Sequence, residues 1–267
     1  LKAFRKSPKH YIQYLTEKRA PTDAMLIGSI VDCLALTPEL FDKKFRVYAK
    51  PNMRTNAGKS EFAKLLQSAG ELKQMLIDNE QLLTAQKTVA ALYSHPEAKM
   101  LLEAKKKAQI KLSWTDRINS LPIVGYVDFE TYLWGEKFIV DLKTTKDADP
   151  DIFVKDYIKF DYLLQTGTYL CGYHKTRFSF PYMIYLAVET DEPFNVSVNF
   201  IESKEMEKAE AEFNGTLKAF RYCMDNALFG QGYEFRLFGT KEYFALRLPG
   251  YWKPTFGNFN TEPNEPS

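Results

Sequence analysis

Apolar positions in the first third of the chain recur at helical intervals. Pro8 divides residues 1–18 into two short helical turns, and residues 23–36 form a further apolar segment with Asp23 as candidate N-cap and an end before Pro38. Residues 59–94 carry leucine and valine at helical spacing without a break. The pattern therefore predicts that residues 1–96 are helical.

The period changes to two after this part, where apolar and polar residues alternate as in a half-buried strand. The predicted elements are strands around 110–114, 121–132 and 137–143, a helix over 151–174, strands over 181–189 and 195–201, and a helix over 203–228. This order predicts an α/β (α+β) fold with a mixed central sheet of about five strands flanked by helices. Without repeats or an obvious linker, residues 1–248 are expected to form a single domain, with its helical part over residues 1–96. Residues 249–267 are expected to form an irregular tail.

The composition is that of an ordinary globular chain, with 267 residues, 45% hydrophobic and 26% charged. No apolar run approaches the roughly 18 residues that a membrane helix needs, which excludes a helical membrane span. Three widely spaced cysteines argue against a disulfide scaffold and favour a reducing, cytoplasmic location.

The net charge of +2 hides local basic segments. Residues 1–20 carry +5 and residues 97–111 carry +3, whereas residues 202–225 are acidic. Aromatic residues among the N-terminal charges, such as Tyr11, are typical of surfaces that bind a nucleic acid strand, because rings stack on bases and cations bind phosphates. The alternative is a solvated surface, which is the usual role of a charged segment.

Two aspartates interrupt strands that are otherwise apolar. Asp128 follows Ile123–Val127 and Asp141 follows Phe138–Val140. The period of two places Asp141 and Lys143 on one face of a strand, and a hairpin would bring Asp128 near them. Such a set can hold Mg²⁺ through carboxylates and orient a water molecule through the lysine. The alternative is a structural Asp–Lys ion pair at the end of a strand.

The order of four short motifs resembles the PD-(D/E)XK nuclease superfamily, and most closely the exodeoxyribonucleases of phages and prophages of the exodeoxyribonuclease VIII type. The N-terminal segment LKAFRKSPKHYIQYL also resembles that group. The motifs are Gly28-x-x-x-Asp32, Gly125-x-x-Asp128, Asp141-Leu-Lys143-Thr-Thr and Gln165-x-x-x-Tyr169. The resemblance covers roughly residues 1–175 and implies a restriction-endonuclease-like fold.

The resemblance assigns roles to these positions. It implies that Asp128 and Asp141 are catalytic carboxylates that bind the metal, that the Leu142 carbonyl adds a ligand, and that Lys143 is the catalytic lysine. The implied metal is Mg²⁺, with Mn²⁺ able to substitute. Asp32 stands where the family usually has His; we expect it to be a third ligand, and the alternative is a local cap or ion pair.

Gln165 and Tyr169 are four residues apart and so share one helix face. The resemblance implies that they contact DNA or steady the active site. An ordinary polar–aromatic pair on a helix is the alternative.

The function that the resemblance implies is a Mg²⁺-dependent exonuclease that degrades one strand of linear double-stranded DNA, 5′→3′, in phage-type homologous recombination. Its partners would be double-stranded DNA ends, a single-strand annealing protein and further copies of the chain in a ring, with no membrane. Two alternatives stay open: a structure- or sequence-specific endonuclease of the same fold, and a catalytically inert DNA-binding module.

Overall fold

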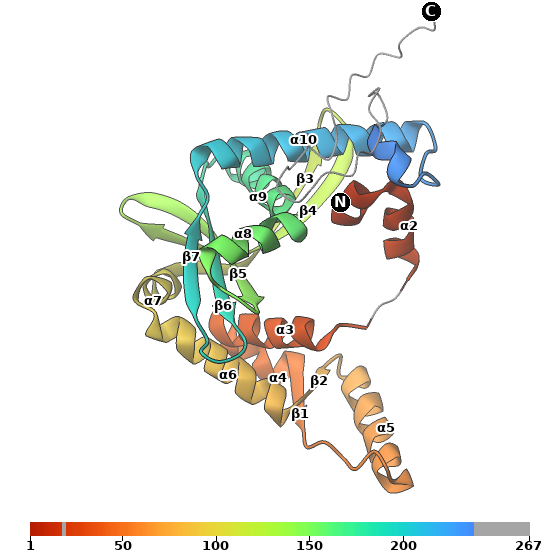
Figure 1. The fold of residues 1–267 in the computed structure, drawn as a ribbon, viewed down its shortest axis with the longest axis vertical. Coiled ribbons are helices and arrows are strands. Elements are labelled where there is room, and N and C mark those ends of the chain that lie inside the picture. The colour runs from red at the N-terminus through yellow and green to blue at the C-terminus, as the bar shows by residue number, and fades with distance from the viewer. Residues whose placement is uncertain (18–19, 238–267) are drawn as a thin grey trace, which may run out of the picture.

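A five-stranded mixed sheet forms the centre of the computed structural model, which describes residues 1–17 and 20–237 (Figure 1). The strand order is β3-β4-β5-β6-β7, with β5 and β6 parallel and the other neighbours antiparallel. The strands are β3 (Lys105–Asp116), β4 (Leu121–Leu133), β5 (Glu136–Thr145), β6 (Tyr182–Glu189) and β7 (Val196–Phe200). The predicted mixed sheet of about five strands is confirmed.

Helices cover both faces of this sheet, which confirms the predicted class (Figure 1). The helices named in the following paragraphs are α1 (Lys2–Lys6), α2 (Pro8–Thr16), α3 (Asp23–Leu36), α5 (Asn56–Glu71), α6 (Asn79–Ser94), α7 (Pro96–Glu103), α8 (Pro150–Lys159), α9 (Tyr162–Arg177) and α10 (Ser203–Asp225). The remaining elements are η1 (Pro38–Leu40), α4 (Phe41–Lys44), β1 (Phe45–Tyr48), β2 (Met75–Asp78) and η2 (Tyr233–Leu237).

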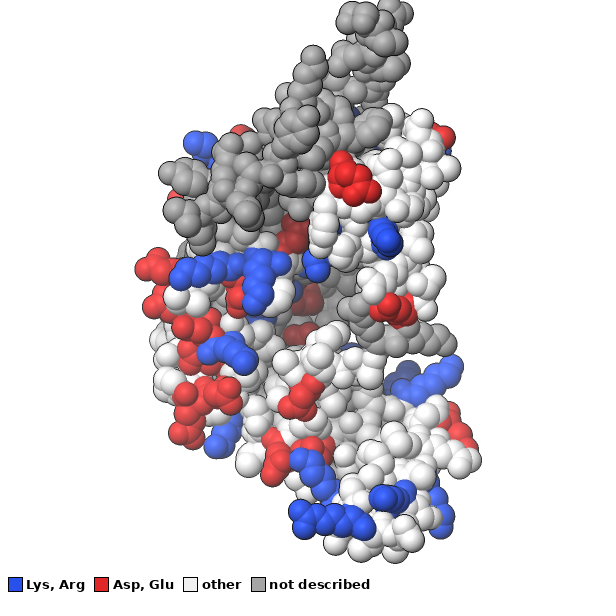
Figure 2. Space-filling view, turned by 45° about the vertical axis from the view of Figure 1, so that its right-hand side comes forward, with Lys and Arg blue, Asp and Glu red and all other residues white. Residues whose placement is uncertain are grey.

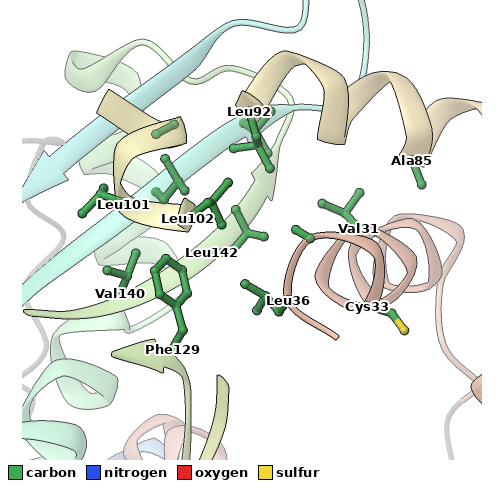
Figure 3. Packing of buried hydrophobic residues seen from close by; sticks show 14 of the residues in the cluster. Val31, Cys33, Leu36, Ala85, Leu92, Leu101, Leu102, Phe129, Val140 and Leu142 are labelled. Carbon is green, nitrogen blue, oxygen red and sulfur yellow. The ribbon is translucent and has the colours of Figure 1, made fainter. Parts of the chain in front are cut away.

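Strand β5 is buried from both sides because two hydrophobic clusters meet on it. Val140 and Leu142 pack with Val31 of α3 and with α6 and α7 (Figure 3). Ile139, on the opposite face, packs with residues of α8 and α9, among them Tyr169. Any polar residue on this strand is therefore enclosed, which sets the environment of Asp141.

The prediction of one continuous helical region over 59–94 is wrong. Helix α5 ends at Glu71, Lys73 takes a left-handed backbone conformation with φ of 55°, and strand β2 follows and pairs in parallel with β1. The apolar residues of this strand continued the helical spacing and so disguised the break. Asp78 and Gln81 then form a capping box that starts α6, a signal that was present in the sequence.

The expected helix over 151–174 is two helices. Helix α8 ends at Lys159, and Asp161 adopts a left-handed conformation with φ of 56° before α9 begins. The helix over 23–36 has the predicted bounds, but Thr22 rather than Asp23 is its N-cap. The expected tail, 249–267, lies outside the described residues, so the domain boundaries stay a prediction. Among residues 1–17 and 20–237, no helix is both long and apolar enough to cross a membrane.

Candidate active site

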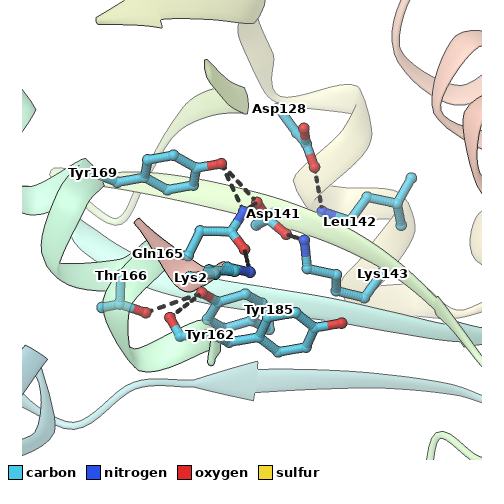
Figure 4. Close-up of polar contacts among 10 residues, drawn as sticks. All are labelled: Lys2, Asp128, Asp141, Leu142, Lys143, Tyr162, Gln165, Thr166, Tyr169 and Tyr185. Atoms are coloured by element: carbon cyan, nitrogen blue, oxygen red, sulfur yellow. Dashed lines mark hydrogen bonds and ion pairs between the residues drawn. The ribbon is translucent and has the colours of Figure 1, made fainter. Parts of the chain in front are cut away.

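The site forms where strands β4 and β5 separate. Their pairing ends at Phe129 and Val140, immediately before Asp128 on one strand and Asp141 on the other. Asp128 spans the gap, because its Oδ2 accepts a hydrogen bond of 2.8 Å from the Leu142 backbone N–H (Figure 4). The two aspartates that the sequence singled out therefore lie together at the opening between the strands.

Strand β4 is irregular at Asp128. Regular alternation would place Val127 and Phe129 on one face, but Val127 packs in the cluster that includes Tyr169, whereas Phe129 packs in the cluster on the opposite face. Gln109, on the neighbouring strand β3, has a left-handed φ of 51°. The sheet thus changes face at this point, and Asp128 sits at the transition.

Asp141 is almost completely buried, with 1% of its surface exposed, and three side chains surround its carboxylate. Oδ1 accepts hydrogen bonds from Gln165 Nε2 at 2.6 Å and from the Tyr169 hydroxyl at 3.3 Å. Oδ2 forms an ion pair with Lys143 (Figure 4). Burial of a carboxylate is costly unless it is paired, so these contacts are what allows Asp141 to remain inside the fold.

Gln165 and Tyr169 share one face of α9, as predicted from their spacing. The second N–H of Gln165 donates to the Tyr169 hydroxyl at 2.7 Å. Both side chains are therefore directed at Asp141 and fix the orientation of its carboxylate. Contact of these residues with DNA stays a prediction.

Lys143 lies on the same face of β5 as Asp141, as the period of two predicts. Burial works against its charge, but Asp141 and Asp128 together raise the pKa of Lys143 above its usual value. Its ammonium group also lies 4.8 Å from the centre of the Tyr162 ring. Lys143 therefore carries a positive charge at neutral pH.

Asp32 reaches the site from α3, which approaches β5 closely at Gly28. Burial and the negative charge of Asp141 raise the pKa of Asp32 to about 7. Burial, Asp141 and Asp32 likewise raise the pKa of Asp128. Three carboxyl groups thus oppose one another's ionisation, which is an arrangement that a bound cation relieves.

The donors present fit a divalent metal ion of the Mg²⁺ type. Within the part of the chain that the structure describes, no three His, Cys, Asp or Glu side chains form a closed ligand cluster. Mg²⁺ does not require one, because it commonly binds one or two carboxylates and completes its shell with water and phosphate oxygens. Asp128 and Asp141 are the residues that would hold it. The roles of Asp32 and the Leu142 carbonyl as further ligands stay predictions.

One residue of the site was not found from spacing. Lys2 of α1 lies with its Nζ 3.2 Å from Gln165 Oε1, and also 5.0 Å from the centre of the Tyr162 ring. The sequence placed Lys2 in a basic segment but gave no sign that this one cation reaches a site formed by residues 128–169. Figure 2 shows acidic side chains recessed in the middle of one face, with basic side chains beside them.

The fold and the site define a PD-(D/E)XK-type domain: a mixed sheet with Asp128 opposite an Asp141-x-Lys143 strand. A family model described as "PDDEXK-like domain of unknown function (DUF3799)" matches residues 1–231, and the chain belongs to this family. The predicted superfamily is therefore confirmed, and this membership supports a nuclease function. PDDEXK nucleases in general use divalent metal ions.

Solved structures resemble the chain in fold at low sequence identity. A protein described as a "Putative exonuclease" from Eubacterium rectale has a TM-score of 0.54 and 12% identity, over 85% of this chain and 80% of that one. The structure of SSO0001 has a TM-score of 0.27 and 11% identity, over 70% of this chain and 85% of that one. No curated protein matches the chain.

Proposed function

We propose that the protein is a Mg²⁺-dependent exonuclease that degrades one strand of linear double-stranded DNA, in the 5′→3′ direction. The observation that carries this proposal is the grouping of Asp128, Asp141 and Lys143 at the opening between β4 and β5. The resemblance of the ordered motifs to exodeoxyribonucleases of the exodeoxyribonuclease VIII type supports the choice of DNA ends as substrate.

In the proposed reaction a water oxygen forms a bond to phosphorus, one ester P–O bond breaks, and the departing alkoxide takes up a proton. Lys143, which is positively charged, orients the water or a phosphate oxygen and stabilises the negative charge that develops there. Gln165 and Tyr169 hold the Asp141 carboxylate in place. A bound divalent ion supplies Lewis acidity and lowers the pKa of the attacking water.

The test compares linear duplexes that carry an end label, with a 5′-phosphate or a 5′-hydroxyl, beside a covalently closed circle, all with Mg²⁺. We expect the linear DNA to be digested and the circle to stay intact. Asp141→Asn is expected to abolish digestion, whereas Asp191→Asn, a matched change at an exposed turn, is expected to leave it unchanged.

The outcomes separate the alternatives. Cutting of the closed circle would identify an endonuclease. Full activity in a folded Asp141→Asn protein would overturn the assigned site. A wild-type protein that neither cuts DNA nor binds Mg²⁺ or Mn²⁺ by calorimetry would be an inert module.

The biological setting is part of the same proposal and rests on the resemblance. It comprises phage-type recombination beside a single-strand annealing protein, assembly of the chain into a ring, and a cytoplasmic location. The three cysteines are buried and free, which agrees with a reducing compartment. Light scattering on the purified chain tests the assembly.

A further inference from the structure

Helix α1 is fixed to the nuclease domain although it has only five residues. Phe4 is fully buried, and its ring centroid lies 4.9 Å from that of Phe220 on α10. The buried Arg5 guanidinium forms ion pairs with Asp161 at 3.3 Å and with Glu212 at 3.2 Å. Arg5 is thus a structural cation of the basic N-terminal segment, and the position of α1 beside α9 and α10 is determined.

This anchoring places Lys2 at the edge of the active site. Lys2 and Lys143 come from opposite ends of the domain sequence, yet both ammonium groups lie about one cation–π distance from the Tyr162 ring, at 5.0 Å and 4.8 Å. Among the described residues, Lys2 forms no ion pair with a carboxylate. Its hydrogen bond to the neutral Gln165 amide leaves its charge uncompensated.

The crowding of the two cations has an electrostatic consequence. Lys2 as a whole is exposed, but burial of its ammonium group and the charge of Lys143 lower the pKa of Lys2. An anion between or beside the two groups would remove this repulsion. Since Lys143 serves the phosphate that is cut, a neighbouring phosphate of the same strand is the anion of matching spacing and charge.

An apolar groove of about 890 Å³ begins at the same place. It shares Lys2, Gln165 and Tyr169 with the active site and runs between α2, α9, α10 and the start of β4. Its walls include aromatic side chains, among them Tyr11, Tyr126 and Phe220. A groove with a cation at its end and rings along its walls matches a nucleotide, which combines an anionic phosphate with an apolar base.

We propose that Lys2 binds the phosphate next to the one that is cut, and that the groove holds nucleosides attached to that phosphate. The proposal rests on the proposed function and adds a substrate subsite to it. The occupant is the strand being degraded, because the groove is continuous with the active site through Gln165 and Tyr169. An apolar peptide is the rival occupant that the test must distinguish.

The phosphate contact is tested by Lys2→Gln on the full chain, with Lys6→Gln as control because Lys6 is an exposed lysine of the same helix. Cleavage of a linear DNA is measured over a range of salt concentrations. Loss of one charged phosphate contact is expected to raise KM about tenfold, to change kcat less than about threefold, and to reduce the slope of log KM against log salt by about one. Lys2→Arg is expected to restore the slope.

The groove is tested by Tyr126→Ala, since Tyr126 lines it and is 55% exposed. Loss of base stacking is expected to raise KM by about fivefold or more without changing the salt slope, because no charge is removed. Tyr132→Ala is the control: Tyr132 lies on the same strand, is 50% exposed and does not line the groove.

If wild type cuts DNA and Lys2→Gln matches Lys6→Gln in KM and salt slope, this inference is overturned while the proposed function stands. A loss of activity in Lys2→Gln that leaves the salt slope unchanged, and that Lys2→Arg does not rescue, also overturns it. If Tyr126→Ala matches Tyr132→Ala, nucleosides do not occupy the groove, as expected for a peptide site. A wild-type protein that cuts no DNA removes the proposed function and this inference with it.

Discussion

A Cβ atom added to Gly28 would lie 3.0 Å from the Thr144 hydroxyl oxygen, so α3 touches β5 directly beside Asp141 and Lys143. This contact gives a physical reason for glycine in the Gly28-x-x-x-Asp32 motif. Asp32 is one helical turn further along, so the close approach at Gly28 is what brings its carboxyl group near the other two.

Gly28→Ala is expected to reduce kcat about tenfold, because a shift of α3 by a fraction of an ångström displaces Asp32. Stability is expected to change little, since the better helix propensity of alanine, worth about 1 kcal/mol, offsets the crowding. Gly70→Ala is the control, because Gly70 has open space around it in α5. Cleavage rates at saturating DNA measure the effect, and full activity in Gly28→Ala would show that the contact does not position the site.

Gln165→Leu tests whether α9 positions the Asp141 carboxylate. The change removes the 2.6 Å hydrogen bond to Asp141, and kcat is expected to fall roughly 10- to 100-fold, as for other residues that orient metal ligands. Tyr169→Phe removes only a 3.3 Å contact and is expected to cost less than about threefold. Gln67→Leu, at an exposed residue of α5, is the control; a change in KM alone would instead indicate DNA binding.

Helices α9 and α10 are in close contact at Gly167, where an added Cβ would lie 2.0 Å from the Ala209 carbonyl oxygen. Gly167→Ala is therefore expected to lower the free energy of unfolding by about 1–3 kcal/mol or more. Gly215→Ala, in open space on α10, is expected to raise it by about 0.5–1 kcal/mol. Urea denaturation of both variants measures the difference, and equal stabilities would contradict the packing at Gly167.

Tyr157 predicts a loss of stability at alkaline pH. Burial raises its pKa to about 12, whereas a tyrosine in the unfolded chain titrates near 10. Below pH 10 both states are neutral. Between pH 10 and 12 the unfolded state ionises first, so the free energy of unfolding falls by about 2–3 kcal/mol through this residue. The titratable groups around it are Asp161, Tyr162, Tyr185 and Glu205.

Unfolding measured between pH 8 and 12 tests this expectation. Tyr157→Phe is expected to lose less stability than wild type over that range. Tyr14→Phe is expected to follow wild type, because Tyr14 is 71% exposed. Identical curves for wild type and Tyr157→Phe would show that Tyr157 does not contribute.

The sequence by itself determined the class of fold and the core of the site, for local reasons. Strands with a period of two and an acid within an apolar run marked β4 and β5, and the Asp141-x-Lys143 spacing fixed both side chains on one face. Where local signals were ambiguous it failed. The apolar residues of β2 imitated a helix, because a short strand buried on one side has the same composition as a buried helical turn.

Only the tertiary structure decided which distant residues join the site. The change of face at Asp128 depends on an irregularity in the neighbouring strand, and the arrival of Lys2 at Gln165 depends on Phe4 and Arg5 fixing α1 against α9 and α10. Spacing along the chain reports only which residues share a local face. Contacts across more than 160 residues are set by packing and ion pairs, so six basic residues that looked equivalent in the N-terminal segment were separated by the fold into a structural arginine and a lysine at the active site.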